Sequence, residues 1–157
     1  MRINSPQEAL YIATEMERRA MQIYERALFL LMEQGREKDP LYATIQSVRA
    51  EEHSHLQWFS SLYTGLGKPL ERKLTLAAVS NGVFFQGGLM EAAREGLLED
   101  VPSMLSYASG EEARATKEYL SFAGQCEDAK VRTMLERIAA EEEKHLRELE
   151  NRREEWM

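Results

Sequence analysis

Apolar residues recur at alternating steps of three and four along four long stretches of the chain, at residues 5–34, 39–64, 100–122 and 128–157. That spacing places them on one face of a helix, whereas a half-buried strand would alternate every second residue. Strand-like alternation is nearly absent elsewhere. The pattern predicts an all-α protein built from four long helices.

The sequence also carries signals for the starts and ends of helices, and these agree with the ranges given above. Ser5 and Glu8 form a capping box, with Pro6 at the first helical position. Gly35 is suited to end the first helix, and an Asp-Pro pair at 39–40 opens the second. The helix limits are therefore supported by capping chemistry as well as by periodicity.

The connections predict how the helices pair. Links of five residues, at 35–39 and 124–128, are short enough to make antiparallel hairpins. Residues 65–100 form a long, mixed crossover between the second and third helices, in which a short helix is expected at 89–98. The expected fold is an antiparallel four-helix bundle with one long crossover.

The two hairpins repeat each other. Residues 1–64 and 100–157 share the same order of apolar, acidic and histidine positions, so residues 1–157 are read as a single domain with an internal repeat. The clearest repeat is "AEEHSHLQWF" at 50–59 and "AEEEKHLREL" at 140–149. Both segments carry charged residues at positions that a bundle buries.

In the middle of each helix, the inner seam holds acidic residues or histidine instead of apolar ones. These positions are Glu17, Glu52, His55, Glu112, Glu142 and His145. Members of a Glu-x-x-His pair share one helix face, because three residues turn a helix by about 300°. Four carboxylates and two imidazoles are thus expected to converge in the bundle interior.

The negative charge of such a cluster must be balanced, because buried carboxylates lose hydration and repel one another. Lys and Arg are missing from the middle of the seams, whereas two divalent cations would balance four carboxylates. Mixed oxygen and imidazole ligands suit iron or manganese, and zinc less specifically. Glu from two helices and Glu-x-x-His from the other two is the arrangement of di-iron carboxylate bundles. The alternatives are mis-phased charged faces, or a site that has lost its metal.

Four segments carry a resemblance to a known family: "ATEMERRAMQIY", "AEEHSHLQWF", "ASGEEARATKEY" and "AEEEKHLREL". The chain resembles the rubrerythrin-like proteins of the ferritin-like superfamily over all four helices. The resemblance implies that the six seam residues bind two iron ions. It also implies that Glu52 and Glu142 bridge the ions, while Glu17 and Glu112 are terminal ligands.

The chain departs from that family in two respects. Full-length rubrerythrins carry a rubredoxin-like iron site with four cysteines, whereas this chain has one cysteine, Cys126. Electrons would then come from another protein, such as a rubredoxin-type donor. Typical rubrerythrins add a seventh carboxylate on the third helix. This chain has Ala115 at that place, or Arg114 if Glu111 were the ligand instead, so the six-ligand set is closer to bacterioferritin-type ferroxidase sites. The resemblance also favours a homodimer.

Two tyrosines follow the seam glutamates by one heptad. Tyr24 follows Glu17, and Tyr119 follows Glu112. Their rings are expected to pack against the cluster, with each hydroxyl bonded to a carboxylate.

Other polar residues lie beside the seam positions. Glu51 and Glu141 precede seam glutamates and either orient an imidazole on the partner helix or remain surface charges. Glu111 and His53 lie off the seam and are expected on the solvated surface.

Charge and composition narrow the classes of partner. The net charge of −7 argues against nucleic acids and anionic membranes as partners, because both attract basic surfaces. The longest apolar run, at 27–32, is far short of a membrane span. One cysteine and an N-terminus without an apolar signal segment favour a cytoplasmic location.

These observations lead to a functional hypothesis. We expect a di-iron oxidoreductase whose ferrous centre is oxidised by hydrogen peroxide or dioxygen, in oxidative-stress defence or iron handling. One alternative is a metal-binding module without turnover. The other is an oxygenase acting on an organic substrate, which would need a larger apolar pocket near the metals.

Overall fold

A computed structural model of the chain describes residues 2–66 and 93–156. For Trp156 it describes only the backbone. Four long helices dominate these ranges: α1 (Pro6–Glu33), α2 (Pro40–Gly65), α5 (Val101–Gln125) and α6 (Ala129–Trp156). The predicted all-α four-helix bundle is confirmed. Residues 67–92 of the expected crossover lie outside the described residues. Of the short helix expected at 89–98, residues 93 and 94 are helical and residues 95–98 form a turn.

Capping sets the helix limits close to those expected. The Ser5 hydroxyl accepts a hydrogen bond from the Glu8 amide at 3.1 Å, and the Glu8 carboxylate accepts one from the Asn4 amide at 3.2 Å. Gly35 follows α1 with a φ of 67°, a left-handed conformation that favours glycine. Asp39 then caps α2 through its side chain.

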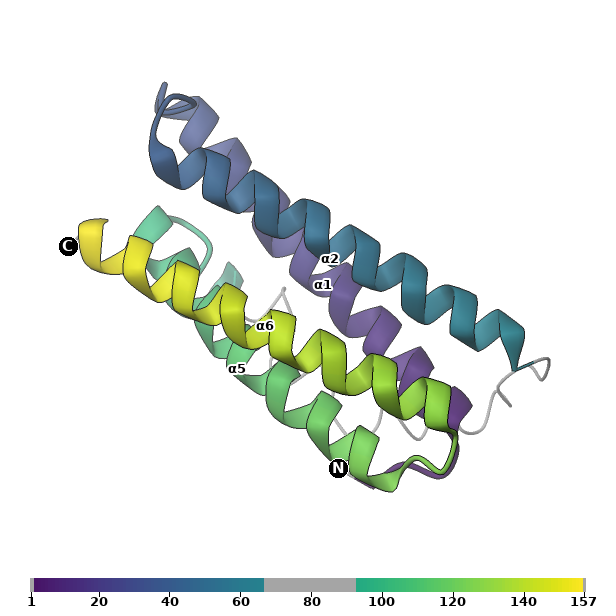
Figure 1. Cartoon of the computed structure of the whole chain (residues 1–157). Coiled ribbons are helices and arrows are strands. Elements are labelled where there is room, and N and C mark those ends of the chain that lie inside the picture. The colour runs from purple at the N-terminus through teal and green to yellow at the C-terminus, as the bar shows by residue number, and fades with distance from the viewer. Residues whose placement is uncertain (1, 67–92, 157) are drawn as a thin grey trace.

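The helices form two antiparallel hairpins, α1 with α2 and α5 with α6 (Figure 1). The hairpins pack together through α1 against α5 and through α2 against α6. Because the start of α1 shares a core with the end of α5, helices that face each other across the two hairpins also run antiparallel. No helix in the described ranges combines the length and apolar character needed to cross a membrane.

The apolar core is divided into two clusters, one at each end of the bundle. One cluster includes Leu10, Ala13, Phe59, Tyr119, Phe122, Leu135 and Ile138. The other includes Ile23, Leu31, Leu41, Ile45, Met104, Leu105 and Leu149. The six seam glutamates and histidines lie between them, so the apolar ends hold a polar layer in the middle of the bundle.

Candidate metal centre

All six seam residues point into the bundle and are at most 2% exposed. They form two groups of four, Glu17–Glu52–His55–Glu142 and Glu52–Glu112–Glu142–His145. Within each group, one potential ligand atom per residue lies within 4.8 Å of all the others. Glu52 and Glu142 belong to both groups, so the two candidate sites are adjacent and share two carboxylates.

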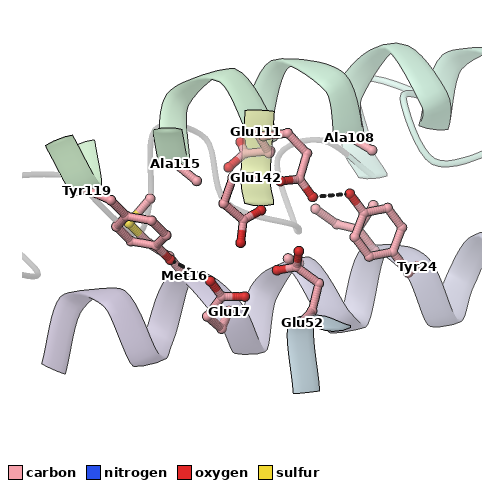
Figure 2. Close-up of a pocket in the computed structure, with 12 residues that line it drawn as sticks. Met16, Glu17, Tyr24, Glu52, Ala108, Glu111, Ala115, Tyr119 and Glu142 are labelled. Atoms are coloured by element: carbon pink, nitrogen blue, oxygen red, sulfur yellow. Dashed lines mark hydrogen bonds between the residues drawn. The ribbon is translucent and has the colours of Figure 1, made fainter. Parts of the chain in front are cut away.

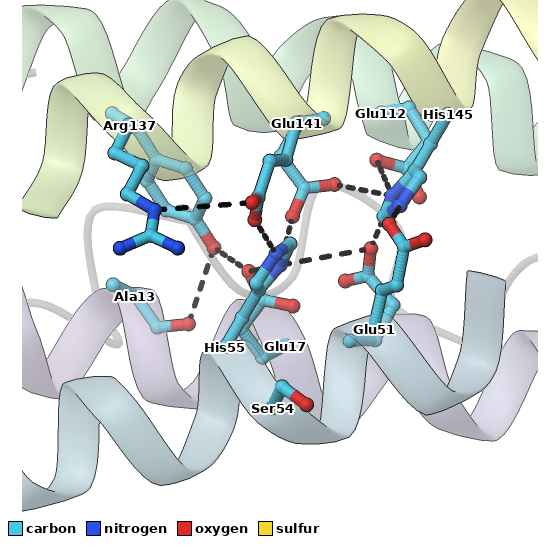
Figure 3. Close-up of polar contacts among 12 residues, drawn as sticks. Ala13, Glu17, Glu51, Ser54, His55, Glu112, Arg137, Glu141 and His145 are labelled. Carbon is cyan, nitrogen blue, oxygen red and sulfur yellow. Dashed lines mark hydrogen bonds and ion pairs between the residues drawn. The ribbon is translucent and has the colours of Figure 1, made fainter. Parts of the chain in front are cut away.

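The two histidines are arranged reciprocally across the hairpins (Figure 3). The Nδ1 atom of His55 lies 2.8 Å from Glu142 Oε1, and the Nδ1 atom of His145 lies 2.7 Å from Glu52 Oε1. The imidazole rings stack with centroids 5.8 Å apart and planes 23° from parallel. Each ring therefore presents Nδ1 to the carboxylate cluster.

The outer nitrogen of each histidine faces a second carboxylate. His55 Nε2 lies 2.5 Å from Glu141 Oε2, and His145 Nε2 lies 2.5 Å from Glu51 Oε2. The sequence left open whether Glu51 and Glu141 lie at the surface or at an imidazole. Both are partly exposed, but each also holds the imidazole of the opposite hairpin, which fixes the ring and leaves Nδ1 for the cluster.

The two tyrosines hold the other two carboxylates (Figure 2). The Tyr24 hydroxyl donates to Glu112, and the Tyr119 hydroxyl donates to Glu17 Oε1 at 2.9 Å. Burial and the neighbouring carboxylates raise the pKa of both phenols well above their usual value, so both remain neutral donors. Each tyrosine reaches from one hairpin to a glutamate of the other.

Burial and mutual repulsion raise the pKa of three carboxyls. The pKa of Glu17 is raised to about 7 by burial and by the nearby Glu142 charge. Burial and the neighbouring carboxylates also raise the pKa of Glu52 and Glu112 well above the usual range. Burial would do the same to Glu142, but the close approach of Glu112 and of both histidines holds its pKa well below the usual value.

The two imidazoles can balance part of the negative charge of the carboxylates. Burial disfavours the charged form of His55, yet hydrogen bonds and charge attraction from Glu142 and Glu17 raise its pKa to about 11. Burial likewise opposes the charge on His145, whose pKa is nevertheless raised by Glu142 and Glu51. Both shifts favour a positively charged imidazole beside the carboxylates.

The donor atoms fit metal ions. The Oε2 atoms of Glu17, Glu112 and Glu142 are buried and have no hydrogen-bond partner within the described part of the chain. Leaving such oxygens unpaired costs about 1–3 kcal/mol each. Donor atoms that lie within 4.8 Å of one another need only small side-chain shifts to reach one ion at the usual bond length of about 2.0–2.2 Å. The cluster can therefore hold metal ions.

A small cavity of about 20 Å³ adjoins the cluster between α1 and α5. The four seam glutamates, both tyrosines and several small side chains line it, among them Ala20, Ala108 and Ala115 (Figure 2). One water needs about 10–15 Å³ by this kind of measure. The cavity therefore has room for one or two water-sized molecules beside the carboxylates.

One residue that lines this cavity, Glu111, lies elsewhere than the sequence predicts. Glu111 was expected on the solvated surface, but it lines the cavity and forms an ion pair with Arg19 at 3.2 Å. Arg19 also donates to the Tyr107 hydroxyl. Helical periodicity misses this network because it depends on which side chains of α1 and α5 face each other. His53 is exposed, as expected.

The stability of the metal-free protein should fall as pH rises from about 6 to about 8. The Glu17 carboxyl has a pKa of about 7 in the folded state against an ordinary value of 4.5, so its protonated form favours folding. This contribution is complete below pH 4.5 and is lost as pH rises through about 7. Glu17 alone should account for about 1–2 kcal/mol over this interval.

The raised pKa of His55 acts in the same direction, because its stabilising contribution is lost as pH rises from 6.5 towards 11. Urea unfolding at several pH values, with and without saturating metal, measures the effect. Bound metal should suppress the loss. A metal-free protein that becomes more stable over this interval would contradict the described cluster.

Replacing Glu51 or Glu141 with glutamine should weaken metal binding by about 10–100-fold, the usual effect of removing a carboxylate that orients a histidine ligand. The internal repeat makes the two variants a matched pair, because each affects one histidine. Isothermal titration calorimetry with the metal measures the affinities. His53→Ala is the control, and equal affinities for all four proteins would argue against metal binding through Nδ1.

No protein-family model, curated protein or solved structure matches this chain. The metal centre is therefore inferred from the chain's own residues. A four-helix, all-α structure with a buried acid and histidine cluster is compatible with a di-iron site.

Proposed function

We propose that the cluster binds two iron ions and that the protein oxidises its ferrous centre with hydrogen peroxide or dioxygen. The observation that carries this proposal is the pairing of two four-residue groups, which share Glu52 and Glu142 and contain one histidine each. The shared carboxylates would bind both ions. Manganese or zinc would also suit these donors, but zinc has no redox chemistry.

When bound, two ferrous ions supply two electrons, which together with two protons reduce one hydrogen peroxide molecule to two water molecules. The protein's part is to bind and orient. Tyr24 and Tyr119 hold the carboxylates of Glu112 and Glu17 through their hydroxyls. The two apolar clusters close the bundle on either side of the polar layer and limit access of water.

The size of the cavity favours a small oxidant. Its volume of about 20 Å³ suits peroxide or dioxygen, whereas an organic substrate needs a pocket of about 300 Å³ or more. The described residues beside the cluster therefore favour peroxide or dioxygen chemistry over an oxygenase acting on an organic molecule.

Repeated turnover requires a source of electrons. Each peroxide molecule consumes two, so an external one-electron donor must react twice per cycle. A rubredoxin-type protein is a donor of this class. The proposed role is defence against peroxide or the handling of iron.

The proposal is tested by loading the protein anaerobically with two ferrous ions per chain and mixing it with peroxide or air-saturated buffer. Stopped-flow absorbance should show ferric iron forming much faster than from free ferrous iron in the same buffer. Glu17→Ala and His55→Ala should slow this oxidation towards the free-ion rate. Persistent ferrous iron, or preferential retention of zinc, would instead support a metal-binding module without turnover.

A further inference from the structure

Two grooves on the α2–α6 side of the bundle occupy equivalent places in the internal repeat. The repeat aligns Glu52 and His55 with Glu142 and His145. The first groove is lined by residues that include Pro40, Thr44, Ser47, Glu148, Arg152 and Glu155. The second, here called the Arg137 groove, is lined by Leu62, Ala129, Lys130, Thr133, Met134 and Arg137. The same backbone arrangement thus presents two different surfaces.

The chemistry of the two grooves differs at corresponding positions. Thr44 corresponds to Met134, and Arg152 corresponds to Leu62. These differences make the Arg137 groove more apolar than the first groove. Among the described residues that line it, the charged ones are Lys130 and Arg137, both positive. The lining of this groove thus carries two positive charges in a chain with a net charge of −7, and Glu141 lies beside one of them, Arg137.

The Arg137 groove is connected to the metal cluster by direct contacts. The Arg137 guanidinium lies 4.8 Å from the centre of the Trp58 ring, and this ring lies 5.8 Å from that of His55. Arg137 also approaches Glu141 Oε1 at 4.0 Å, while the other oxygen of Glu141 contacts His55 (Figure 3). An aromatic ring and a carboxylate therefore both link the groove to one histidine of the cluster.

The other half of the repeat lacks these links. Glu148 takes the place of Trp58, and Ser47 takes the place of Arg137. These residues provide neither an aromatic ring nor a cation beside His145. The two halves of the repeat thus differ at the positions that link this groove to His55.

We propose that the Arg137 groove is the docking surface for an acidic one-electron donor protein, and that Trp58 connects this surface with His55. The inference rests on the proposed function, in which two donor molecules each lose one electron and the oxidised centre gains both. Lys130 and Arg137 would attract the donor's acidic face. Leu62 and Met134 supply apolar contact area at the centre of the surface.

Charge reversal tests the docking surface, with reduced rubredoxin as the acidic donor. Arg137→Glu and Lys130→Glu should each lower the second-order rate constant of rubredoxin oxidation by the ferric protein by roughly tenfold at low salt. Lys130→Glu leaves the Glu141 contact intact, so it separates docking from changes around His55. Arg152→Glu makes the same change of charge in the other groove and is the matched control.

Binding is measured separately from electron transfer. Calorimetry should show weaker rubredoxin binding to Arg137→Glu and Lys130→Glu, and high salt should reduce the difference from the parent by screening the charges. Trp58→Leu should slow electron transfer at saturating rubredoxin, and Trp58→Phe should restore part of the rate because it keeps an aromatic ring.

Equal binding and equal rates for Arg137→Glu, Lys130→Glu and Arg152→Glu would overturn the proposal. A change from dimer to monomer in sedimentation of either groove variant would also overturn it, by showing that a second copy covers the groove. Peroxide oxidation of the ferrous parent protein needs no donor. Its failure would refute the proposed function, whereas its success with unaffected groove variants would refute only the docking surface.

Discussion

Replacing Glu52 with glutamine is expected to leave the metal-free protein as stable as the parent near pH 6 and to abolish the stabilisation that iron provides. Burial and the neighbouring carboxylates raise the pKa of Glu52 well above its usual range, which favours the neutral carboxyl that an amide resembles in shape. Glutamine lacks the anionic oxygen that a metal requires. Because Glu52 belongs to both groups of four, both sites should be lost.

The expected effect is large. A site loaded at 100 times its Kd stabilises the folded state by about 2.7 kcal/mol, so two sites contribute about 5 kcal/mol. For a domain of this size, this corresponds to a rise in Tm of roughly 10–20 °C. Differential scanning calorimetry with and without iron should show this rise for the parent and for Glu143→Gln, an exposed control. A Glu52→Gln protein that keeps the rise would contradict a shared carboxylate.

Phe59→Ala should have the largest effect on the stability of the fold, about 3–5 kcal/mol in the free energy of unfolding. Phe59 is fully buried and packs edge-on against Tyr119, with ring centroids 5.4 Å apart. Truncation leaves a cavity beside Tyr119, whose hydroxyl holds Glu17. Metal affinity should therefore fall more in the group that contains Glu17 than in the group that contains Glu112.

Urea unfolding of the metal-free protein measures the loss, and Phe29→Ala is its control. The Phe29 side chain is 48% exposed, so its removal should cost about 1 kcal/mol or less. Equal costs at Phe59 and Phe29 would contradict the described packing of the apolar cluster beside the polar layer.

The helices and the buried cluster could be predicted because their signals are local. Ser5, Gly35 and Asp39 mark helix ends through capping and turn chemistry that involves residues a few positions away. The steps from Glu52 to His55 and from Glu142 to His145 fix one face of each helix. An apolar seam must turn towards the core, and the polar residues within it are therefore buried.

The contacts between helices could not be predicted in the same way. Periodicity gives the inward face of a helix, but not its position along or rotation about its neighbour. The sequence therefore indicated that Tyr24 would reach a carboxylate without showing that this is Glu112. For the same reason it placed Glu111 on the surface, although Arg19 of α1 meets it beside the cavity. Such pairs depend on how the two hairpins pack.

The most direct test of a paired metal centre is anomalous X-ray diffraction at the iron edge from crystals of protein loaded anaerobically with ferrous iron. Two peaks are expected within the cluster, both adjacent to Glu52 and Glu142, one beside His55 and the other beside His145. Loaded crystals without peaks there, in which these side chains bond only to one another or turn to solvent, would contradict such a centre.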